Sequence, residues 1–497
     1  MKTYLLAHDL GTSGNKAVLY DEQGSLCAST LYEYQTDYPE AGFVEQDPED
    51  WWRAVCSSTR ELIAKAKISP GQIACVSFSG QMMGCLLVDR QGIPLRRMII
   101  WADTRSQKQA DELGERYGVA EFYQTTGHRL SPSHTITKFM WVKEHEPENY
   151  EKIHTVMFPK DYIRYRMCGG LGTDMSDASS GAIFDTRNRQ WAWELIEKLG
   201  MNKEIFPECR ESSEIAGEVT EDCAASTGLK AGIKIAYGGG DTLMQGVGNG
   251  IIAPGTLAAN IGTACQLSGG FHEPVYDKEF RTNTFCHVKK DLWMLMGAHL
   301  SGGVAMKWLM NQILDMGSFD EMTALASTVP AGSEGMVFLP YLSGERTPYN
   351  DPDAKGIYFG MTLKHTRAHM IRSTMEGIVF GLRSSIEIFK GLGIEYHKII
   401  ASGGGARGRL FLQMQADIFD CDIYTNQGSE QAGIGAAITA AVACGEYKDY
   451  EEACAKLVHM KDEAVSPIRE NQKHYEEQFA VYRELYRHNQ DLFHLKG

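Results

Sequence analysis

Short apolar runs flank glycine-rich turns along the chain, and the first such arrangement lies at its start. Residues 4–7 and 17–20 are apolar and enclose the turn DLGTSGNK, so they predict two strands joined in a hairpin. A second turn of similar design follows far downstream, where residues 258–263 (AANIGT) lie over residues 7–12 (AHDLGT). We therefore expect two related hairpins, one in each half of the chain.

The spacing of apolar positions predicts helices and further strands elsewhere. Residues 47–66 place Trp51, Val55 and Leu62 on one helical face, with Asp47 or Asp50 as the cap. Buried strands are predicted at 73–81 and 399–401, and a strand beginning at 234 runs into a glycine-rich turn and a helix of small residues. Helices are also predicted at 301–314, 369–389, 410–419, 430–445 and 466–493.

The length of the chain predicts more than one domain. A chain of 497 residues exceeds what a single hydrophobic core usually supports. The segment 251–256 separates the small-residue helix from the second glycine turn. We therefore expect an N-terminal domain over residues 1–252 and a C-terminal domain over residues 253–497.

Composition and charge narrow the range of partners. The net charge of −15 argues against nucleic acid, because binding a phosphodiester backbone needs dense Lys and Arg. The 12 cysteines include no CxxC pair, which makes a structural zinc site improbable. The start of the sequence shows neither a signal peptide nor a membrane span, so we expect a cytoplasmic protein with free thiols and no membrane partner.

The first turn suits a phosphate group. Gly11, Thr12 and Ser13 allow backbone N–H groups and hydroxyls to converge on an anion, and Lys16 follows them. The carboxylate of Asp9 is suited to Mg²⁺ and is expected to hold the ion through water. An ordinary tight hairpin is the alternative, but the second turn at Gly262 and Thr263 favours two turns that grip one polyphosphate. The chain contains no GxxxxGK[ST] loop.

Asp241 is the candidate catalytic base. It follows three glycines at the end of a predicted strand, where a carboxylate faces a cleft rather than a sheet. Beside a sugar hydroxyl, such a carboxylate accepts the proton as phosphorus is attacked. The alternative role is a helix N-cap.

A glycine pattern in the second half permits another enzyme class. Gly403, Gly405 and Gly408 match GxGxxG, and Asp422 stands near the distance at which a dinucleotide fold places its ribose acid. An NAD-dependent dehydrogenase is therefore an alternative, although this pattern usually opens its domain. The same glycines also offer a flat surface for an adenine ring.

Residues between the first turn and Asp241 are candidates for a sugar pocket. Gln81, Met82 and Met83 end one strand, and Trp101 and Arg105 follow another. Each has a plainer interpretation: methionines fill cores, Trp101 packs, and Arg105 forms a salt bridge with Asp103. His8 is expected to be a hydrogen-bonded strand residue rather than a ligand.

Longer segments resemble the FGGY carbohydrate kinases. The turns DLGTSGNK and NIGT resemble the two phosphate turns of that family, and residues 135–145 and 356–376 resemble its two signatures. Three further segments resemble the branch of the family that acts on the ketose D-xylulose: FPKDYIRYRM, TDMSDASSG and FLPYLSGERTPYNDPDAKG.

The resemblance implies two actin/hexokinase-like (ribonuclease H-like) α/β domains that bind ATP and sugar in a central cleft. It implies that Asp241 is the base, that Asp9, Thr12 and Thr263 handle phosphate and Mg²⁺, and that Gly404, Gly405 and Arg407 form the nucleotide loop. A homodimer is also plausible for this family. The implied reaction is transfer of the ATP γ-phosphate to a terminal hydroxyl of a ketose, foremost D-xylulose.

Two positions depart from the family pattern. Met83 stands where a sugar-binding histidine is typical, and Thr242 replaces an asparagine after the base. Both changes are expected to reshape hydroxyl recognition, so ribulose, a tetrulose, a pentitol or gluconate remain alternative acceptors. From another class, an actin- or Hsp70-like ATP-gated binding protein with no small acceptor is also open.

Overall fold

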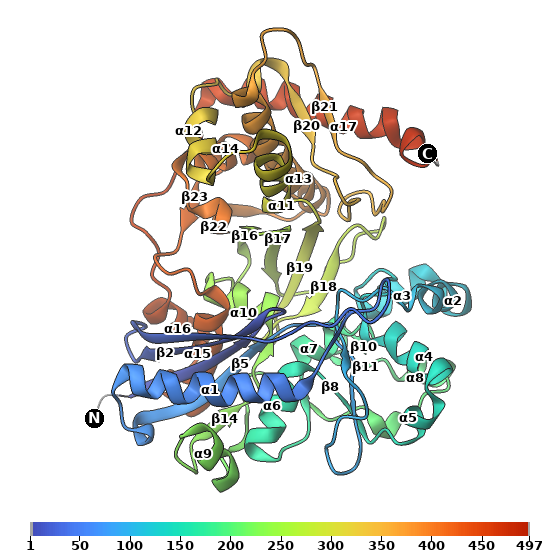
Figure 1. Ribbon diagram of the computed structural model, residues 1–497, viewed down its shortest axis with the longest axis vertical. Coiled ribbons are helices and arrows are strands. Elements are labelled where there is room, and N and C mark those ends of the chain that lie inside the picture. Colours follow the sequence, from blue (N-terminus) through green and yellow to red (C-terminus); the bar gives the residue numbers. More distant parts are fainter. Residues whose placement is uncertain (1–2, 496–497) are drawn as a thin grey trace.

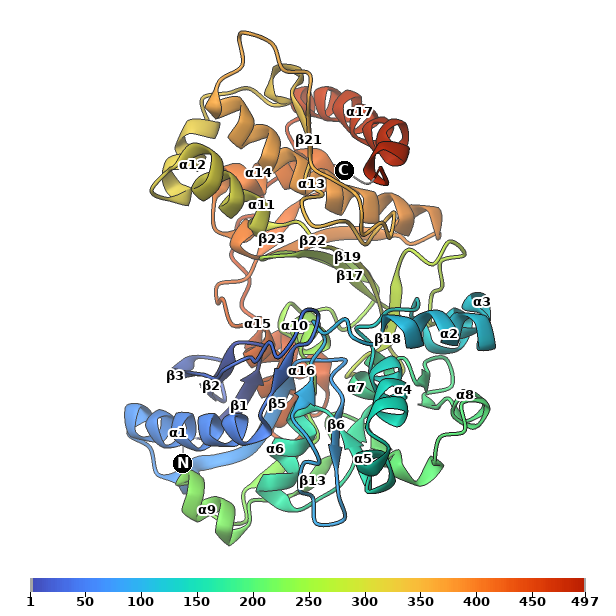
Figure 2. The same ribbon diagram turned by 45° about the vertical axis from the view of Figure 1, so that its right-hand side comes forward.

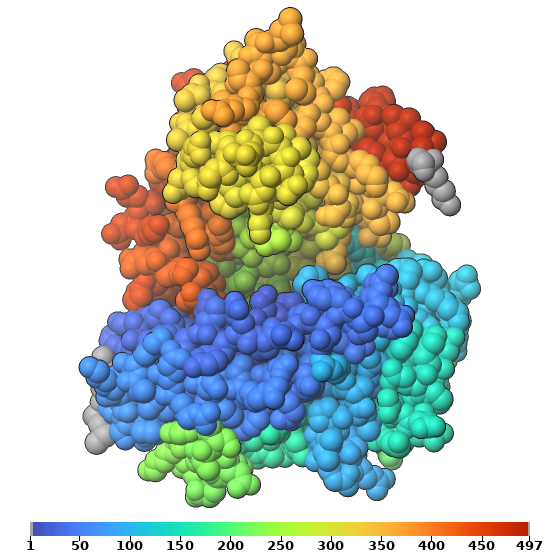
Figure 3. Space-filling view, viewed as in Figure 1, coloured from blue at the N-terminus to red at the C-terminus, as the bar shows by residue number. Residues whose placement is uncertain are grey.

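The computed structural model describes residues 3–495 and shows two α/β halves stacked along the long axis of the molecule (Figure 1). Each half is built on one large mixed sheet with helices packed against it, as the turned view also shows (Figure 2). In the space-filling view the surface narrows between the halves (Figure 3). The α/β fold with two lobes is therefore confirmed.

The first sheet has the strand order β13-β14-β5-β1-β2-β3. Strands β1 and β2 form the predicted antiparallel hairpin, and β5 lies parallel to β1 on its other side. A short strand, β15, continues along β5. The bounds are β1 Tyr4–Leu10, β2 Gly14–Asp21, β3 Leu26–Glu33, β5 Ile73–Gly80, β13 Ile215–Glu218, β14 Lys234–Ala236 and β15 Gly239–Gly240.

The second sheet repeats this arrangement. Its order is β18-β19-β17-β16-β22-β23, with β16 antiparallel to β17 and parallel to β22. The series β19-β17-β16-β22-β23 therefore matches β3-β2-β1-β5-β14 in order and direction, as expected from the repeated turn. The bounds are β16 Gly255–Ile261, β17 Cys265–Phe271, β18 Asn283–Cys286, β19 Trp293–His299, β22 Tyr396–Gly403 and β23 Ile423–Thr425.

Most predicted helices are present. Helix α1 begins after Asp47, whose side chain accepts a hydrogen bond from the Glu49 N–H, so Asp47 rather than Asp50 is the cap. The helix expected over 301–314 differs, because α11 ends at Trp308 and a π-helical turn follows over 309–314. The bounds are α1 Pro48–Ala66, α11 Gly303–Trp308, α13 Arg367–Gly391, α14 Arg409–Phe419, α15 Gln431–Cys444 and α17 Arg469–Phe493.

One late helix returns to the first lobe. Helix α15 packs against β1, β5 and α10 (Asp241–Gly248), although it follows the last strand of the second sheet. The two helices approach so closely that a Cβ on Gly435 would overlap the backbone of Met244. The boundary at residue 252 stays a prediction, and the second half of the chain contributes to both lobes.

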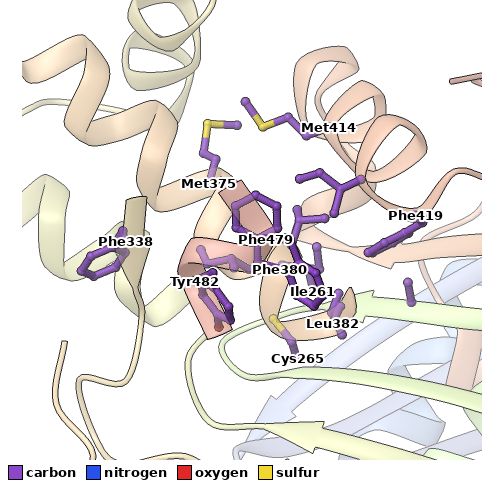
Figure 4. Close-up of a cluster of buried hydrophobic side chains, with 14 of the residues drawn as sticks. Ile261, Cys265, Phe338, Met375, Phe380, Leu382, Met414, Phe419, Phe479 and Tyr482 are labelled. Atoms are coloured by element: carbon purple, nitrogen blue, oxygen red, sulfur yellow. The ribbon is translucent and has the colours of Figure 1, made fainter. Parts of the chain in front are cut away.

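A hydrophobic core in the lobe built on the second sheet anchors the second glycine turn. Ile261, the residue before Gly262, is buried with aromatic side chains from α13 and α17, among them Phe380 and Tyr482 (Figure 4). Anchoring the strand end in this way fixes where the turn emerges into the space between the lobes.

None of the helices within residues 3–495 has both the length and the apolar composition needed to cross a bilayer.

Candidate functional site

The first turn lies where β1 meets its two neighbouring strands. Asp9 pairs with Lys16 on β2 and with Ser79 on β5, and the Ser79 hydroxyl donates a hydrogen bond of 2.7 Å to Asp9 Oδ1. Burial raises the pKa of Asp9; Ser79 and Lys16 oppose this effect. Thr12 and Ser13 remain accessible at the tip of the turn, as a phosphate-binding turn requires.

Gln46, which the sequence analysis did not identify, organises this turn. Its amide nitrogen donates to the Thr12 carbonyl over 2.7 Å, and its amide oxygen accepts from the Gln81 side chain over 2.7 Å. Trp101 also contacts this turn, because its indole N–H donates to the Thr12 hydroxyl over 2.9 Å. Gln46 therefore joins the first turn to the predicted sugar side. Its role depends on contacts between residues distant in sequence, which no local pattern reveals.

Asp241 is the first residue of α10 and half-buried at the same edge of the sheet. The preceding Gly240 pairs with Gly80, one residue beyond the Ser79 that binds Asp9. Asp241 is not the N-cap, which is Gly240. Its Oδ1 accepts from the backbone N–H and the hydroxyl of Thr242, over 2.6 and 3.2 Å.

The environment of Asp241 suits a proton acceptor. Burial is the larger cause and the negative charge of Asp9 the second, and together they raise the pKa of Asp241 to about 7. The hydrogen bonds from Thr242 act in the opposite direction. A carboxyl with a pKa near neutrality holds a transferred proton and still starts deprotonated at slightly alkaline pH.

The second turn lies against the glycine loop that follows β22. A Cβ on Gly403 would stand 2.5 Å from Asn260 Oδ1, and one on Gly405 would stand 2.7 Å from Ile261. Gly403 also has a φ of 72°, so glycine is required there on both counts. The end of β16, which leads into Gly262 and Thr263, therefore lies against the loop that contains Gly404 and Arg407.

Helix α10 carries the base and also touches the second turn. Gln245 stands one helical turn after Asp241, and its side-chain oxygen accepts from Asn260 over 3.1 Å and from Gln266 over 3.2 Å. Asn260 and Gln266 belong to the strands that flank the second turn. The two turns and Asp241 therefore meet through α10.

Lys16 forms an ion pair across the chain. Its Nζ lies 2.7 Å from Glu430 Oε2, in the loop that enters α15. Glu430 also lines a cavity of about 810 Å³ that lies between the lobes. It is lined by Gly403, Gly404 and Arg407 on one side and by Tyr20 and Leu26 on the other, and it has room for a nucleotide.

The predicted sugar residues follow β5. Gln81 and Met82 are buried, and Met82 packs against Gly240. Met83 is half-buried and has a φ of 63°, which is uncommon for a residue with a side chain. Such strain is typical of residues held in place at functional sites.

Arg105 has a different environment from the other sugar candidates. Its guanidinium is almost completely buried and pairs with Asp103 and Glu45, each over 2.7 Å. It also lies over the rings of Phe43 and Trp141. These contacts correspond to the salt-bridge interpretation of Arg105, and a role in sugar binding stays a prediction.

Two other arginines, Arg129 and Arg346, lie close enough to each other and to the buried Glu345 for their charges to interact. Within residues 3–495 no hydrogen bond or ion pair joins the guanidinium of Arg129 or Arg346 to another group, and Arg129 is only 8% exposed. Burial, followed by the charge of Arg346, lowers the pKa of Arg129 to about 10, and the charge of Glu345 acts in the opposite direction. The charge of Arg346 also lowers the pKa of His134. The ring of His134 contacts the carbonyl of Ser180, whose hydroxyl accepts from the Met83 N–H. One nearby carboxylate does not offset two guanidinium charges, so this pair favours a ligand that supplies a further acceptor.

The residues around Asp9 fit a hydrated magnesium ion. Asp9 uses only one carboxylate oxygen in hydrogen bonds within the described chain, and Asp241 is close enough for their charges to interact. Among residues 3–495, the one group of three potential metal ligands is Asp351, Asp353 and His494, and it lies away from Asp9. One or two carboxylates with water and substrate phosphates are the usual protein contribution to a Mg²⁺ site.

His8 is confirmed as a structural residue. It is fully buried, and its ring contacts Asn15 and Thr59 over 3.2 and 3.4 Å. Burial lowers its pKa to about 4.

Comparison with known proteins gives a consistent result over nearly the whole chain. Residues 4–248 match the N-terminal domain, and residues 257–444 the C-terminal domain, of the FGGY family of carbohydrate kinases. The xylulose kinase of Bacillus subtilis is 34% identical over 489 residues, which cover 98% of each chain. The gluconokinase of the same organism is 28% identical and covers 91% of this chain and 90% of its own.

Solved structures agree with the sequence comparison. The gluconate kinase and the ligand-bound xylulose kinase of Lactobacillus acidophilus each superpose with a TM-score of 0.93 at 27% identity, and 98% of each chain is covered. Overall shape therefore does not separate the two acceptors.

Proposed function

Because the chain belongs to the FGGY family of carbohydrate kinases, we propose that it transfers the γ-phosphate of ATP to the terminal hydroxyl of D-xylulose. The observation that carries this proposal is Asp241, whose pKa of about 7 and position beside the first turn suit a base. The dehydrogenase and the ATP-gated binding protein are not retained, since neither phosphorylates a carbohydrate. The mixed sheet around β22 also differs from the parallel sheet of a dinucleotide fold.

In the proposed mechanism Asp241 accepts the proton of the acceptor hydroxyl while that oxygen attacks the γ-phosphorus. The N–H groups of the first turn and the hydroxyls of Thr12 and Thr263 donate to phosphate oxygens and stabilise the charge of the transition state. Magnesium bound near Asp9 would supply neutralisation of phosphate charge. Closure of the lobes around the substrates would exclude water and limit hydrolysis of ATP.

The nucleotide is proposed to lie along the glycine loop. Gly403, Gly404 and Arg407 border the 810 Å³ cavity, and the two glycines, which have no side chains, leave a flat surface for an aromatic base. Lys16 pairs with Glu430, which lines this cavity, so its ammonium group lies near the proposed path of the phosphate chain.

Gluconate is the second candidate acceptor, and one observation favours it. The guanidinium groups of Arg129 and Arg346 have the charge of Glu345 nearby but form no ion pair within residues 3–495, and a sugar carboxylate would supply a direct partner. Against this, the chain is 34% identical to the xylulose kinase of Bacillus subtilis and 28% identical to its gluconokinase, and guanidinium groups also donate to neutral hydroxyls.

A substrate panel tests the proposal. ADP release is measured with Mg²⁺–ATP and D-xylulose, D-ribulose, a tetrulose, a pentitol or D-gluconate, and the product is identified by ³¹P NMR. We expect the highest kcat/KM with D-xylulose. A higher kcat/KM with gluconate would identify the sugar acid as the acceptor. ATP turnover that no acceptor stimulates would refute the kinase mechanism at this site. Arg129→Met then separates the two acceptors, because it removes charge complementarity to gluconate but only one donor to xylulose.

A further inference from the structure

Three buried serines of one short helix each bind the backbone of a different element. Helix α7 (Met175–Ser180) is part of the segment TDMSDASSG, to which the mechanism above assigns no role. The hydroxyl oxygens accept backbone N–H groups as follows: Ser176 from Gly240 over 3.0 Å, Ser179 from Cys286 over 3.0 Å and Ser180 from Met83 over 3.3 Å. All three serines are completely buried.

Two of these contacts reach the proposed site directly. Gly240 immediately precedes Asp241 and has no side chain of its own, so only its backbone can be held in place. Met83 has left-handed backbone angles, and its carbonyl accepts a hydrogen bond of 2.8 Å from the buried Lys138. Ser180 and Lys138 therefore hold both sides of a strained residue at the sugar pocket.

Helix α7 is itself fixed by a buried ionic network. Asp174 caps the helix and accepts from the hydroxyls of Ser176 and Ser212, over 2.5 and 2.8 Å. Lys160 lies 2.9 Å from Asp174 and 3.2 Å from Asp177. Because these groups are fully buried and joined by ion pairs and hydrogen bonds, the position of the helix is strongly determined.

We propose that α7 is a fixed spacer that sets the position of the catalytic base relative to the sugar. Ser176 and Ser180 stand four residues apart on one face of the helix, about 6 Å along its axis. Ser176 positions Asp241 through Gly240, and Ser180 positions the turn at Met83. Both are positioning residues and neither touches the reacting atoms. The inference rests on the proposed role of Asp241.

The two serines are expected to affect different kinetic constants. Ser176→Ala leaves the Gly240 N–H without an acceptor and displaces the base, so kcat falls about tenfold with both KM values within about twofold of wild type. Ser180→Ala releases Met83, so the KM for the sugar rises about tenfold and the KM for ATP stays the same. In an Asp241→Asn background, Ser176→Ala should lower kcat further by less than about twofold, because its effect acts through the base.

Ser212→Ala is the matched control. It removes a bond to the same Asp174 carboxylate and keeps the backbone carbonyl that accepts from the Gly238 N–H, so it reports destabilisation of the network alone. We expect thermal stability to fall as for Ser176→Ala, with kcat and both KM values unchanged.

The outcomes separate this inference from the proposed function. If Asp241→Asn is inactive while Ser176→Ala and Ser180→Ala show the kinetics of Ser212→Ala, the spacer role is wrong and the kinase mechanism stands. If Asp241→Asn keeps the wild-type rate, the assignment of the base is wrong and the spacer proposal falls with it. The split between kcat and sugar KM in folded variants is the result that supports the inference.

Discussion

Asp9 and Asn260 occupy the same position in the two sheets. Asp9 pairs with Lys16 in the neighbouring antiparallel strand and with Ser79 in the parallel one, and Asn260 pairs in the same way with Gln266 and Ser402. The repeat therefore places a carboxylate in the first turn and a neutral amide in the second. This difference concentrates negative charge on the side of Asp241, where it raises the pKa of the base.

The activity should depend on the ionisation of Asp241. Since the base must start deprotonated, kcat/KM is expected to rise with pH through about 7 and to level off above it. Thr242 donates to Asp241 and lowers its pKa, so Thr242→Val, which keeps the backbone N–H, should move the midpoint to higher pH. A pH profile of both proteins measures this shift, and an unchanged or lower midpoint would contradict it.

The raised pKa also has a consequence for stability. The folded protein retains the proton of Asp241 to about pH 7, whereas the unfolded chain loses it near 3.8, so stability falls as pH rises between these values. Asp241→Asn removes this penalty. We expect its Tm at pH 8 to exceed that of wild type by roughly 2–4 °C, with the gain shrinking toward pH 4.

Calorimetry over this pH range provides the comparison. Asp462→Asn, which alters an exposed carboxylate in a loop, is the control and should leave the Tm unchanged at each pH. A lower Tm for Asp241→Asn at pH 8 would show that the carboxylate is stabilised rather than penalised by its surroundings.

The ion pair between Lys16 and Glu430 should weaken nucleotide binding. Glu430→Gln frees the lysine for phosphate and removes a charge that raises the pKa of Asp9, so the KM for ATP is expected to fall about two- to fivefold. Glu446→Gln, at the opposite end of α15, is the matched control. An increased KM for ATP in Glu430→Gln alone would mean that the pair itself shapes the nucleotide site.

A histidine at position 83 should improve recognition of the ketose. Met83→His supplies a hydrogen-bond donor, and histidine tolerates the left-handed backbone found there. We expect kcat/KM for D-xylulose to rise about fivefold. Met361→His, at an exposed position after β21 (Ile357–Phe359), should have no effect. A loss of activity in Met83→His would indicate that the thioether packs against the substrate.

Local sequence patterns predicted the frame of the molecule. The alternation of apolar runs and glycine turns located β1, β2, β5 and β22, and the amphipathic spacing located α1 and α13, because these elements bury a face that the sequence displays. The repeat of one turn predicted the repeat of the sheet. The π-helical segment at 309–314 was missed because its apolar spacing resembles that of an α-helix.

The site was harder to complete because much of it depends on tertiary burial. Gln46 resembles any surface glutamine in the sequence, and Arg129 resembles any surface arginine, yet both are buried in the fold. Lys16 was predicted to bind phosphate, but its partner Glu430 is 414 positions away. The return of α15 to the first lobe is likewise set by close glycine contacts with α10, which no local pattern signals.

The most direct test of the central claim is the phosphorylation rate of Asp241→Asn with saturating ATP and D-xylulose at pH 8. With the base removed and the fold verified by circular dichroism, kcat is predicted to fall by about 10²–10⁴. A folded variant that phosphorylates D-xylulose within about twofold of the wild-type rate would contradict the assignment of Asp241 as the base.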